Sequence, residues 1–176
     1  MKHRPLNREE IKSVKNHLIT YLGNNIENFK FENLYVLEDK DKYDVIYANK
    51  EVLEILKNFA KNIYGVGISF GNFEIKHSNS GNKINKINKI KFSISLEGMS
   101  LISKDIVKNY IIVNKKGETL FLYGRDIFKS SILEMNGGGK VAVFNKNREL
   151  LGIGNYGGGD MIKNIIDKGW YLRKGG

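Results

Sequence analysis

Apolar side chains recur every three or four residues near the start of the chain, which is the spacing of an amphipathic helix. The stripe consists of Ile11, Val14, Leu18 and Leu22. Asn7 precedes it as a candidate N-cap, Glu10 lies three residues further on as in a capping box, and Gly23 follows as a stop. The pattern predicts a helix from about residue 8 to residue 22.

Short runs of β-branched and aromatic residues follow this helix. Residues 34–37 and 43–48 are two such runs with a charged stretch between them, which is typical of a β-hairpin. Apolar positions at helical spacing predict a second helix over about 51–63. Residues 66–75 have the composition of a strand with an interruption at Gly71. The first half of the chain therefore alternates helices and strands.

The second half contains shorter apolar runs separated by segments rich in glycine and asparagine. The predicted strands are 92–96, 109–113, 119–123, 141–144, 150–153 and 169–173. Turns are expected at 114–117 and 145–148, and short helices after Gly124 and from Asp160 to Ile166. This density of strands and glycine turns favours a small barrel or sandwich. We expect a domain boundary between residues 96 and 103.

Residues 82–90 repeat Asn-Lys-Ile three times. A period of three matches neither a strand nor an α-helix. The segment is either a basic finger whose lysines touch phosphates or a low-complexity insertion at a hairpin tip. The sequence favours the insertion.

The formal net charge of +10 favours a polyanionic partner. The 29 basic residues comprise 24 lysines and 5 arginines, and the abundant Lys, Asn and Ile share A/T-rich codons. Codon bias therefore weakens the charge as an argument, and residues 1–92 and 93–176 each carry +5. The arginines are more informative than the lysines. They are Arg4, Arg8, Arg125, Arg148 and Arg173.

Several classes of chemistry lack the residues that they need. The chain has no cysteine, which excludes disulfides, thiolate metal sites and a cysteine nucleophile. None of the three histidines pairs with another ligand at metal-binding spacing, and no serine lies in a nucleophile elbow. Residues 152–157 match G-x-G-x-x-G, but too few residues follow for a βαβ unit. We therefore predict no catalytic residue, no cofactor and no metal.

Basic and aromatic side chains remain, at predicted turns and strand ends of the second half. Arginine binds phosphate bidentately and stacks on bases, and aromatic rings stack on any base. Arg125 and Lys129 are expected on one face of the short helix after Gly124. Singly, each residue fits a solvated surface or a core, whereas the set on one small β-domain favours RNA. The candidate RNA-binding residues are Lys115, Lys116, Arg125, Lys129, Arg148, Trp170, Arg173 and Lys174.

Four segments carry a resemblance to a known family. They are Arg4-Pro5-Leu6 with Glu9-Glu10, Ser69-Phe70-Gly71-Asn72-Phe73, Phe121-Leu122-Tyr123-Gly124 with Lys129-Ser130, and Gly169-Trp170-Tyr171-Leu172-Arg173. Together they resemble the Nip-seven family of archaeal and eukaryotic factors for biogenesis of the large ribosomal subunit. Against that family the Asn-Lys-Ile repeat is an insertion. Lys129 and Arg173 match the family well, whereas Arg125 stands where eukaryotic members have a neutral polar residue.

The resemblance implies an α+β protein with two domains. An N-terminal α/β domain with an antiparallel sheet is expected over residues 1–96, and a PUA-like β pseudo-barrel, an RNA-binding module, over residues 97–176. The implied role is non-enzymatic. It is binding of single-stranded or U-rich precursor ribosomal RNA in large-subunit biogenesis and rRNA processing, beside other ribosome-assembly proteins. Two alternatives stay open: a protein–protein adaptor in an assembly complex, and an accessory protein for RNA modification.

The expected location of the protein follows from the absence of a membrane-spanning run and of a signal-peptide core in the sequence. No apolar run has the roughly 18 residues of a membrane span, and no apolar signal core follows the basic start Met1–Pro5. We therefore expect a cytoplasmic protein without a membrane partner. The resemblance implies an archaeal member of the family, and we expect it to be a monomer.

Overall fold

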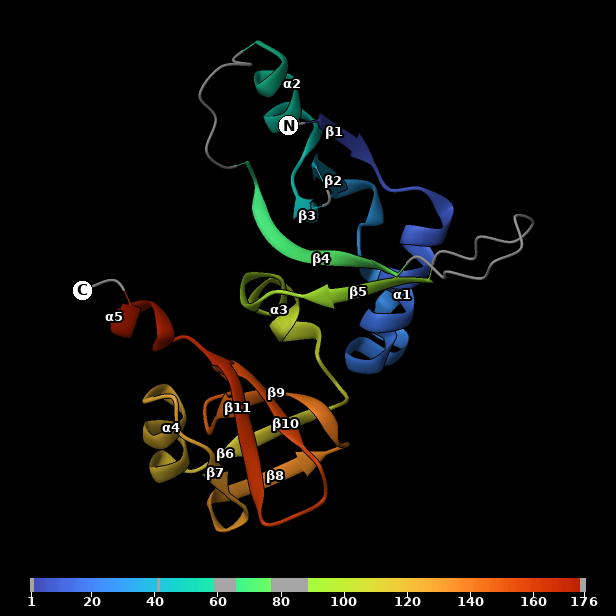
Figure 1. The fold of residues 1–176 in the computed structure, drawn as a ribbon. Coiled ribbons are helices and arrows are strands. Elements are labelled where there is room, and N and C mark those ends of the chain that lie inside the picture. The colour runs from blue at the N-terminus through green and yellow to red at the C-terminus, as the bar shows by residue number, and fades with distance from the viewer. Residues whose placement is uncertain (1, 41, 59–65, 77–88, 175–176) are drawn as a thin grey trace. The chain divides into compact units, whose positions relative to one another are not determined.

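The computed structural model describes residues 2–40, 42–58, 66–76 and 89–174, and the chain divides into two compact units (Figure 1). The first unit contains residues 1–18 and 27–98, and the second contains residues 19–26 and 99–176. Each unit has its own sheet and its own helices, which confirms the predicted α+β class. The Asn-Lys-Ile repeat lies outside the described residues except at positions 89 and 90.

The first sheet is antiparallel throughout, with the strand order β1-β2-β3-β4-β5. Its strands are β1 (Lys2–Pro5), β2 (Leu34–Asp39), β3 (Lys42–Tyr47), β4 (Ile68–Lys76) and β5 (Lys89–Ile94). The hairpin and β4 confirm the predictions from the hydrophobic pattern. The strand predicted at 92–96 is correct over 92–94, whereas β5 begins earlier, at Lys89, and Leu96 begins the helix α3 (Leu96–Ile102). β1 was not predicted, because its Lys-His-Arg-Pro sequence has no apolar alternation. It forms through backbone pairing with β2, where Arg4 lies opposite Val36.

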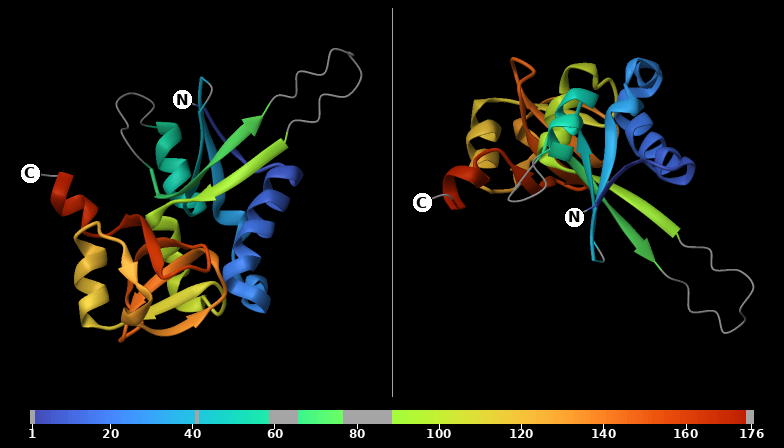
Figure 2. Two further views of the ribbon diagram at one scale, coloured as in Figure 1. Left: turned by 60° about the horizontal axis from the view of Figure 1, so that its bottom comes forward. Right: turned by 90° about the horizontal axis from the view of Figure 1, so that it is seen from above.

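Two helices cover opposite faces of the first sheet (Figure 2). They are α1 (Arg8–Leu22) and α2 (Lys50–Asn58). Leu53 of α2 belongs to one apolar cluster with Ile46 of β3 and Tyr35 of β2. The alternate residues of β2, including Val36, are buried on the other face, where Ser13 of α1 accepts a hydrogen bond from the Phe92 N–H at 3.1 Å. Alternation along β2 thus places one helix on each side.

The capping box at the start of α1 confirms the predicted signal. The Asn7 side chain accepts from the Glu10 N–H at 3.0 Å, and the Glu10 carboxylate accepts from the Asn7 N–H at 2.8 Å. Two 3-10 turns, η1 (Gly23–Asn28) and η2 (Phe31–Asn33), lead from α1 into β2.

The second sheet curls into a half-barrel with the strand order β7-β11-β10-β9-β6-β8. Its strands are β6 (Tyr110–Val113), β7 (Ile127–Phe128), β8 (Ile132–Asn136), β9 (Gly139–Asn145), β10 (Leu150–Tyr156) and β11 (Met161–Asp167). β6 and β9 are parallel, and the other pairs are antiparallel. Inside the curl lies one apolar core, which includes Ile111, Phe121, Ile127, Val143 and Ile162.

The remaining elements lie before, between and after these strands in the chain. They are α3 (Leu96–Ile102), η3 (Ser103–Asp105), α4 (Lys115–Leu122), η4 (Lys129–Ser131) and α5 (Trp170–Lys174). α4 lies beside the half-barrel in every view (Figures 1 and 2).

The strand predicted at 119–123 and the turn predicted at 114–117 were wrong, because both segments belong to α4. Asn114 caps the helix by accepting from the Gly117 N–H at 3.0 Å. Gly117 and Phe121, four apart, are its buried residues. Burial of this face against the core outweighs the β-propensity of the Thr-Leu-Phe-Leu-Tyr run.

Three further predictions in the second unit were wrong. The segment after Gly124 forms β7, η4 and β8 rather than a helix, so Arg125 and Lys129 do not share a helical face. Residues 161–167 form β11, since Ile162 is buried between exposed neighbours and strand pairing decides the conformation. Residues 170–174 form α5, because the chain leaves the sheet at Gly169, whose carbonyl accepts from the Arg173 N–H.

Candidate nucleic-acid interface

At the C-terminal end of α4 the chain passes from the buried core to the surface of the second unit. Phe121 is fully buried in the core, whereas its neighbour Leu120 is half-buried. Tyr123, directly after the helix, is 70% exposed. Gly124 then turns the chain with φ +77°, in the left-handed region that favours glycine. The helix end thus presents an apolar side chain and a solvent-facing aromatic ring.

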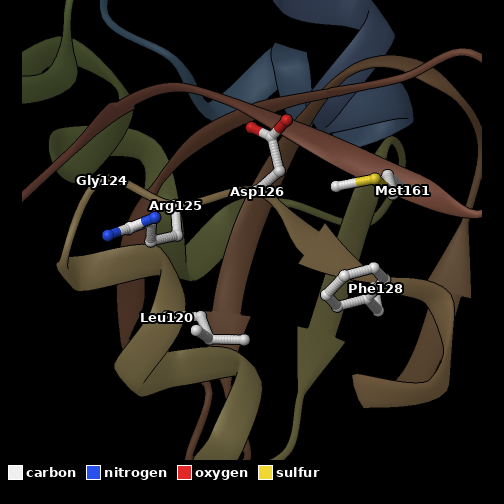
Figure 3. A pocket seen from close by; sticks show the side chains of 6 residues that line it. All are labelled: Leu120, Gly124, Arg125, Asp126, Phe128 and Met161. Atoms are coloured by element: carbon white, nitrogen blue, oxygen red, sulfur yellow. The ribbon is translucent and has the colours of Figure 1, made fainter.

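A pocket of about 480 Å³ lies between this helix end and the edge of the sheet (Figure 3). It is lined by Leu120, Gly124, Arg125, Asp126, Phe128 and Met161. Phe128 of β7 and Met161 of β11 are cross-strand partners, and both are exposed. Apolar surface left in water beside a guanidinium suits a flat, polar-edged ring such as a nucleobase.

The pocket wall is held by hydrogen bonds from the sheet. The Asp126 carboxylate accepts from the Asn164 N–H of β11 at 2.9 Å. The Lys129 N–H donates to the Asp160 carbonyl at 2.8 Å, which fixes the end of β7 beside the hairpin of β10 and β11. Lys129 itself is exposed, immediately after Phe128. These backbone hydrogen bonds therefore fix the positions of two basic residues, Arg125 just before β7 and Lys129 just after it.

α5 carries a second group of aromatic and basic side chains. The rings of Trp170 and Tyr171 meet edge to face with centroids 5.3 Å apart, and both are exposed. The Lys174 ammonium lies 5.6 Å from the Trp170 ring centroid, within cation–π range. This is the pairing of stacking surface and charge that single-stranded nucleic acids require.

Arg173 makes contacts within the protein. Its Nη2 lies 2.8 Å from Oδ2 of the buried Asp167, its Nη1 lies 3.1 Å from Oδ1, and Nη1 also donates to the Leu122 carbonyl. Hydrogen bonding to Asp167 raises the pKa of the guanidinium. The predicted binding residue is thus tied to the end of α4.

Arg148 also has partners within the protein. It lies in the β9–β10 turn with φ +58°, and its guanidinium carbon lies 4.6 Å from the Tyr110 ring centroid and 5.7 Å from that of Phe144. One Nη donates to the Ile106 carbonyl at 3.4 Å. The guanidinium stacks on rings of its own domain.

Lys115 and Lys116 are exposed at the beginning of α4, the opposite end of the helix from the pocket. Lys115 pairs with Glu118 at 3.2 Å. An eight-residue helix is about 12 Å long, so these lysines are separated from Arg125 by roughly that distance.

The structure therefore brings part of the predicted set together. Gly124 lines the pocket and also lies beside the Arg173 guanidinium, so the pocket and α5 adjoin. Arg125, Lys129, Trp170 and Lys174 are exposed around these two features. Lys115, Lys116 and Arg148 lie elsewhere. Sequence reasoning missed Tyr123, Phe128 and Met161. The exposure of Tyr123 depends on α4, which was predicted as a strand, and that of Phe128 and Met161 depends on β7 and β11, which were predicted as helices.

The first unit has a polar cluster of a different kind. Arg4 donates to both oxygens of the buried Glu10 at 2.7 Å and to Glu38 at 2.6 Å, which ties β1 to α1 and β2. Burial alone disfavours the charged Glu10, but hydrogen bonds from Arg4 and from the Asn7 N–H outweigh it and hold its pKa below the ordinary value. A pocket of about 310 Å³ beside Arg4 is lined also by Tyr35, Lys50 and Leu53.

Among the residues that the structure describes, no helix has the length and apolarity to cross a membrane. Nor do the described side chains include a group of three or more His, Asp or Glu placed to hold a metal ion.

Comparison with known sequences matches almost the whole chain. Residues 3–96 match the family model described as NIP7/UPF0113, pre-PUA domain, and residues 109–176 match the UPF0113 PUA domain. A UPF0113 protein of Archaeoglobus fulgidus is 33% identical over 129 residues, which are 64% of this chain and 73% of that protein. A UPF0113 protein of Aeropyrum pernix is 38% identical over 68 residues, 38% of this chain and 39% of that one.

Two solved structures share the fold. A hypothetical protein of Pyrococcus horikoshii has a TM-score of 0.55 at 14% identity, with 97% of this chain and 99% of that chain covered. A conserved PUA domain protein of Thermoplasma acidophilum has a TM-score of 0.53 at 14% identity, with 96% and 95% covered.

Proposed function

Because the chain belongs to the NIP7/UPF0113 family and ends in its PUA domain, we propose that it binds single-stranded RNA through residues 97–176. The observation that carries the proposal is the pocket at the end of α4, where exposed Phe128 and Met161 lie beside Arg125. Exposed aromatic surface next to cations is the chemistry by which proteins hold unpaired bases and their phosphates.

The proposed contacts follow the surface from β7 to α5. A base enters the pocket against Phe128, and Arg125 and Lys129 neutralise the flanking phosphates. A second base stacks on Trp170 or Tyr171, with Lys174 at the backbone. Lys115 and Lys116, at the opposite end of α4 and about 12 Å from the pocket, are proposed as separate phosphate contacts for a longer RNA. Arg148 and Arg173 support the fold, because both guanidinium groups already have partners.

The family adds the biological setting of the proposal. The RNA is precursor or mature ribosomal RNA, with a preference for U-rich stretches, and the protein works beside other assembly factors of the large ribosomal subunit. It acts without catalysis, as a monomer in the cytoplasm. Two alternatives remain as outcomes of the tests below: an adaptor for which RNA contact is incidental, and an accessory protein for RNA modification.

Salt dependence of RNA binding tests the proposal. Affinity for a fluorescein-labelled U15 strand is measured by anisotropy between 50 and 300 mM salt. With four to six phosphate contacts, log K falls against log salt with a slope of roughly −3 to −4. In the double variant Arg125→Gln/Lys129→Gln, the magnitude of the slope is expected to be smaller by about 1.4, since each single-strand phosphate contact contributes about 0.7.

A matched variant separates the proposed surface from bulk charge. Lys146→Gln removes one exposed charge on the β9–β10 turn, outside the proposed path. Its salt slope is expected to equal that of the wild type within experimental error. Equal losses in Lys146→Gln and in single Arg125→Gln would indicate a diffuse charge effect. Wild-type binding without any salt dependence would overturn the proposal. Protein partners that persist after nuclease treatment, together with weak RNA binding, would favour the adaptor.

A further inference from the structure

The short helix α5 has little to hold it in place. It has five residues, and none of them is buried. One turn of helix is unstable in water unless tertiary contacts hold it. Its side chains are tied to the rest of the second unit through Arg173, whose guanidinium donates to the Asp167 carboxylate and to the Leu122 carbonyl.

The surroundings of this guanidinium are shaped to receive it. A Cβ atom on Gly124 would lie 3.0 Å from Nη2 of Arg173. A Cβ on Gly169 would lie 2.8 Å from Nη1 and would also overlap the Leu122 carbonyl oxygen. Side chains at either glycine would therefore displace the arginine. These two glycines belong to the Phe-Leu-Tyr-Gly and Gly-Trp-Tyr-Leu-Arg segments, so the two motifs meet at one ion pair.

The ion pair continues into the wall of the pocket. Oδ2 of Asp167 accepts from the Asn164 side chain at 3.1 Å, and the same amide nitrogen donates to the Phe121 carbonyl at 2.7 Å. The Asn164 N–H donates to Asp126, which lines the pocket. One chain of hydrogen bonds thus joins α5, the end of α4 and the pocket.

We propose that Arg173 and Asp167 form a latch that positions α5, and that Arg173 serves RNA binding by presenting Trp170, Tyr171 and Lys174 rather than by touching phosphate. This inference rests on the proposed function. It predicts effects opposite in sign to those of simple charge. Asp167→Asn removes a negative charge and yet weakens binding to an anion. Arg173→Lys keeps the positive charge but loses the two-pronged guanidinium that pairs with Asp167, and it also weakens binding.

Three variants and one matched control test the latch by U15 anisotropy. Arg173→Lys and Asp167→Asn each lower affinity by at least about fivefold, the lower end of the loss of one stacked base, with the salt slope unchanged. Lys174→Gln reduces the magnitude of the salt slope by about 0.7, because one phosphate contact is lost. Asp105→Asn, which removes an exposed acid in η3 outside the proposed path, leaves affinity equal or higher.

Trp170 is the one tryptophan of the chain, so its fluorescence reports on α5 directly. In free protein, Arg173→Lys and Asp167→Asn are expected to lower Trp170 anisotropy and raise acrylamide quenching, while circular dichroism and the melting temperature of Arg173→Lys stay near wild type. Those optical results hold or fail even when wild type binds no RNA, so failure of the latch and failure of the proposed function are distinguishable.

Two results would overturn the latch. One is Arg173→Lys binding as tightly as wild type, or losing about 0.7 of the slope, which identifies Arg173 as a phosphate contact or as dispensable. The other is unchanged Trp170 anisotropy in both latch variants.

Discussion

At the scale of single residues, partners within the fold separate structural cations from those free to bind. Arg4, Arg148 and Arg173 all look alike in the sequence, yet each has its guanidinium occupied by a carboxylate, by carbonyls or by aromatic rings. Arg125 and Lys129 are exposed and adjoin an apolar pocket. Side-chain exposure together with neighbours, and not residue type, selects the proposed RNA contacts.

Replacing Phe128 by alanine is expected to weaken RNA binding without unfolding the protein. The ring is 51% exposed, so its removal costs little burial, whereas loss of a stacked base costs about 1–3 kcal/mol of binding free energy. Anisotropy with U15 measures the loss. Leu133→Ala, at a residue 59% exposed on β8, is the matched apolar truncation and retains wild-type affinity. Equal affinity in both variants contradicts a stacking role for Phe128.

Glu10 makes the stability of the first unit depend on acid pH. Its pKa is lowered in the folded protein, so its contribution is complete above the ordinary carboxyl pKa of about 4.3 and is lost as pH falls through the folded value. Urea unfolding between pH 7 and pH 3 measures this. Glu10→Gln loses about 2 kcal/mol at pH 7, because charge-assisted hydrogen bonds from Arg4 disappear, and its stability falls less steeply below pH 4. An identical pH profile in wild type and variant refutes the assignment.

At the scale of elements, tertiary contacts decide several conformations. α4 contains a run with strand-like composition, yet burial of Gly117 and Phe121 makes it a helix. β11 begins after Asp160, a residue that suits a helix cap, yet pairing with β7 and β10 makes it a strand. The pocket depends on both outcomes, since Leu120 comes from α4 and Met161 from β11.

The cap of α4 provides a test at this scale. Asn114→Ala removes the acceptor of the Gly117 N–H and is expected to cost about 1 kcal/mol of unfolding free energy. Chemical denaturation followed by circular dichroism measures the change. Asn114→Asp keeps an acceptor oxygen at the cap and stays close to wild-type stability. Comparable destabilisation by Ala and Asp shows that the cap is not the source of the effect.

At the scale of the whole molecule, the second unit includes a piece of chain from far upstream. The Tyr21 carbonyl accepts from the N–H groups of Val107 and Lys108, each at 2.9 Å, and the Thr20 carbonyl accepts from Asn109 at 3.0 Å. The Tyr21 hydroxyl donates to the Lys140 carbonyl at 3.2 Å, and burial raises the pKa of this phenol to about 12. The PUA half is therefore completed by residues 19–26.

A fragment of residues 97–176 alone is expected to be less stable than the same residues in the full chain. It lacks the acceptors for Val107, Lys108 and Asn109, and each lost hydrogen bond costs on the order of 1 kcal/mol. Scanning calorimetry is expected to show a melting temperature lower by about 10 °C or more. Amide hydrogen exchange at Val107 and Lys108 is fast in the fragment and slow in the full chain. Equal melting and equal protection would show that residues 19–26 are dispensable.

The sequence by itself determined the local features whose signals lie close together in the chain. Helix α1 with its Asn7–Glu10 capping box, the β2–β3 hairpin and the strands with alternating burial all follow from short-range patterns, because caps, turns and amphipathic periodicity act over a few residues. The resemblance of four short segments also indicated the family, which the match of both family models confirms.

Only the tertiary structure decided which residues share a surface. β1 takes its conformation from pairing with β2, 30 or more residues away, and α4 and β11 take theirs from burial and strand pairing across the half-barrel. The contacts of Arg173 with Asp167 and Leu122 hold α5. The pocket joins residues 120 and 161, and the Arg173–Asp167 pair joins α5 to the end of α4. Such long-range contacts leave no periodic trace in the sequence, because each depends on where the chain returns in space.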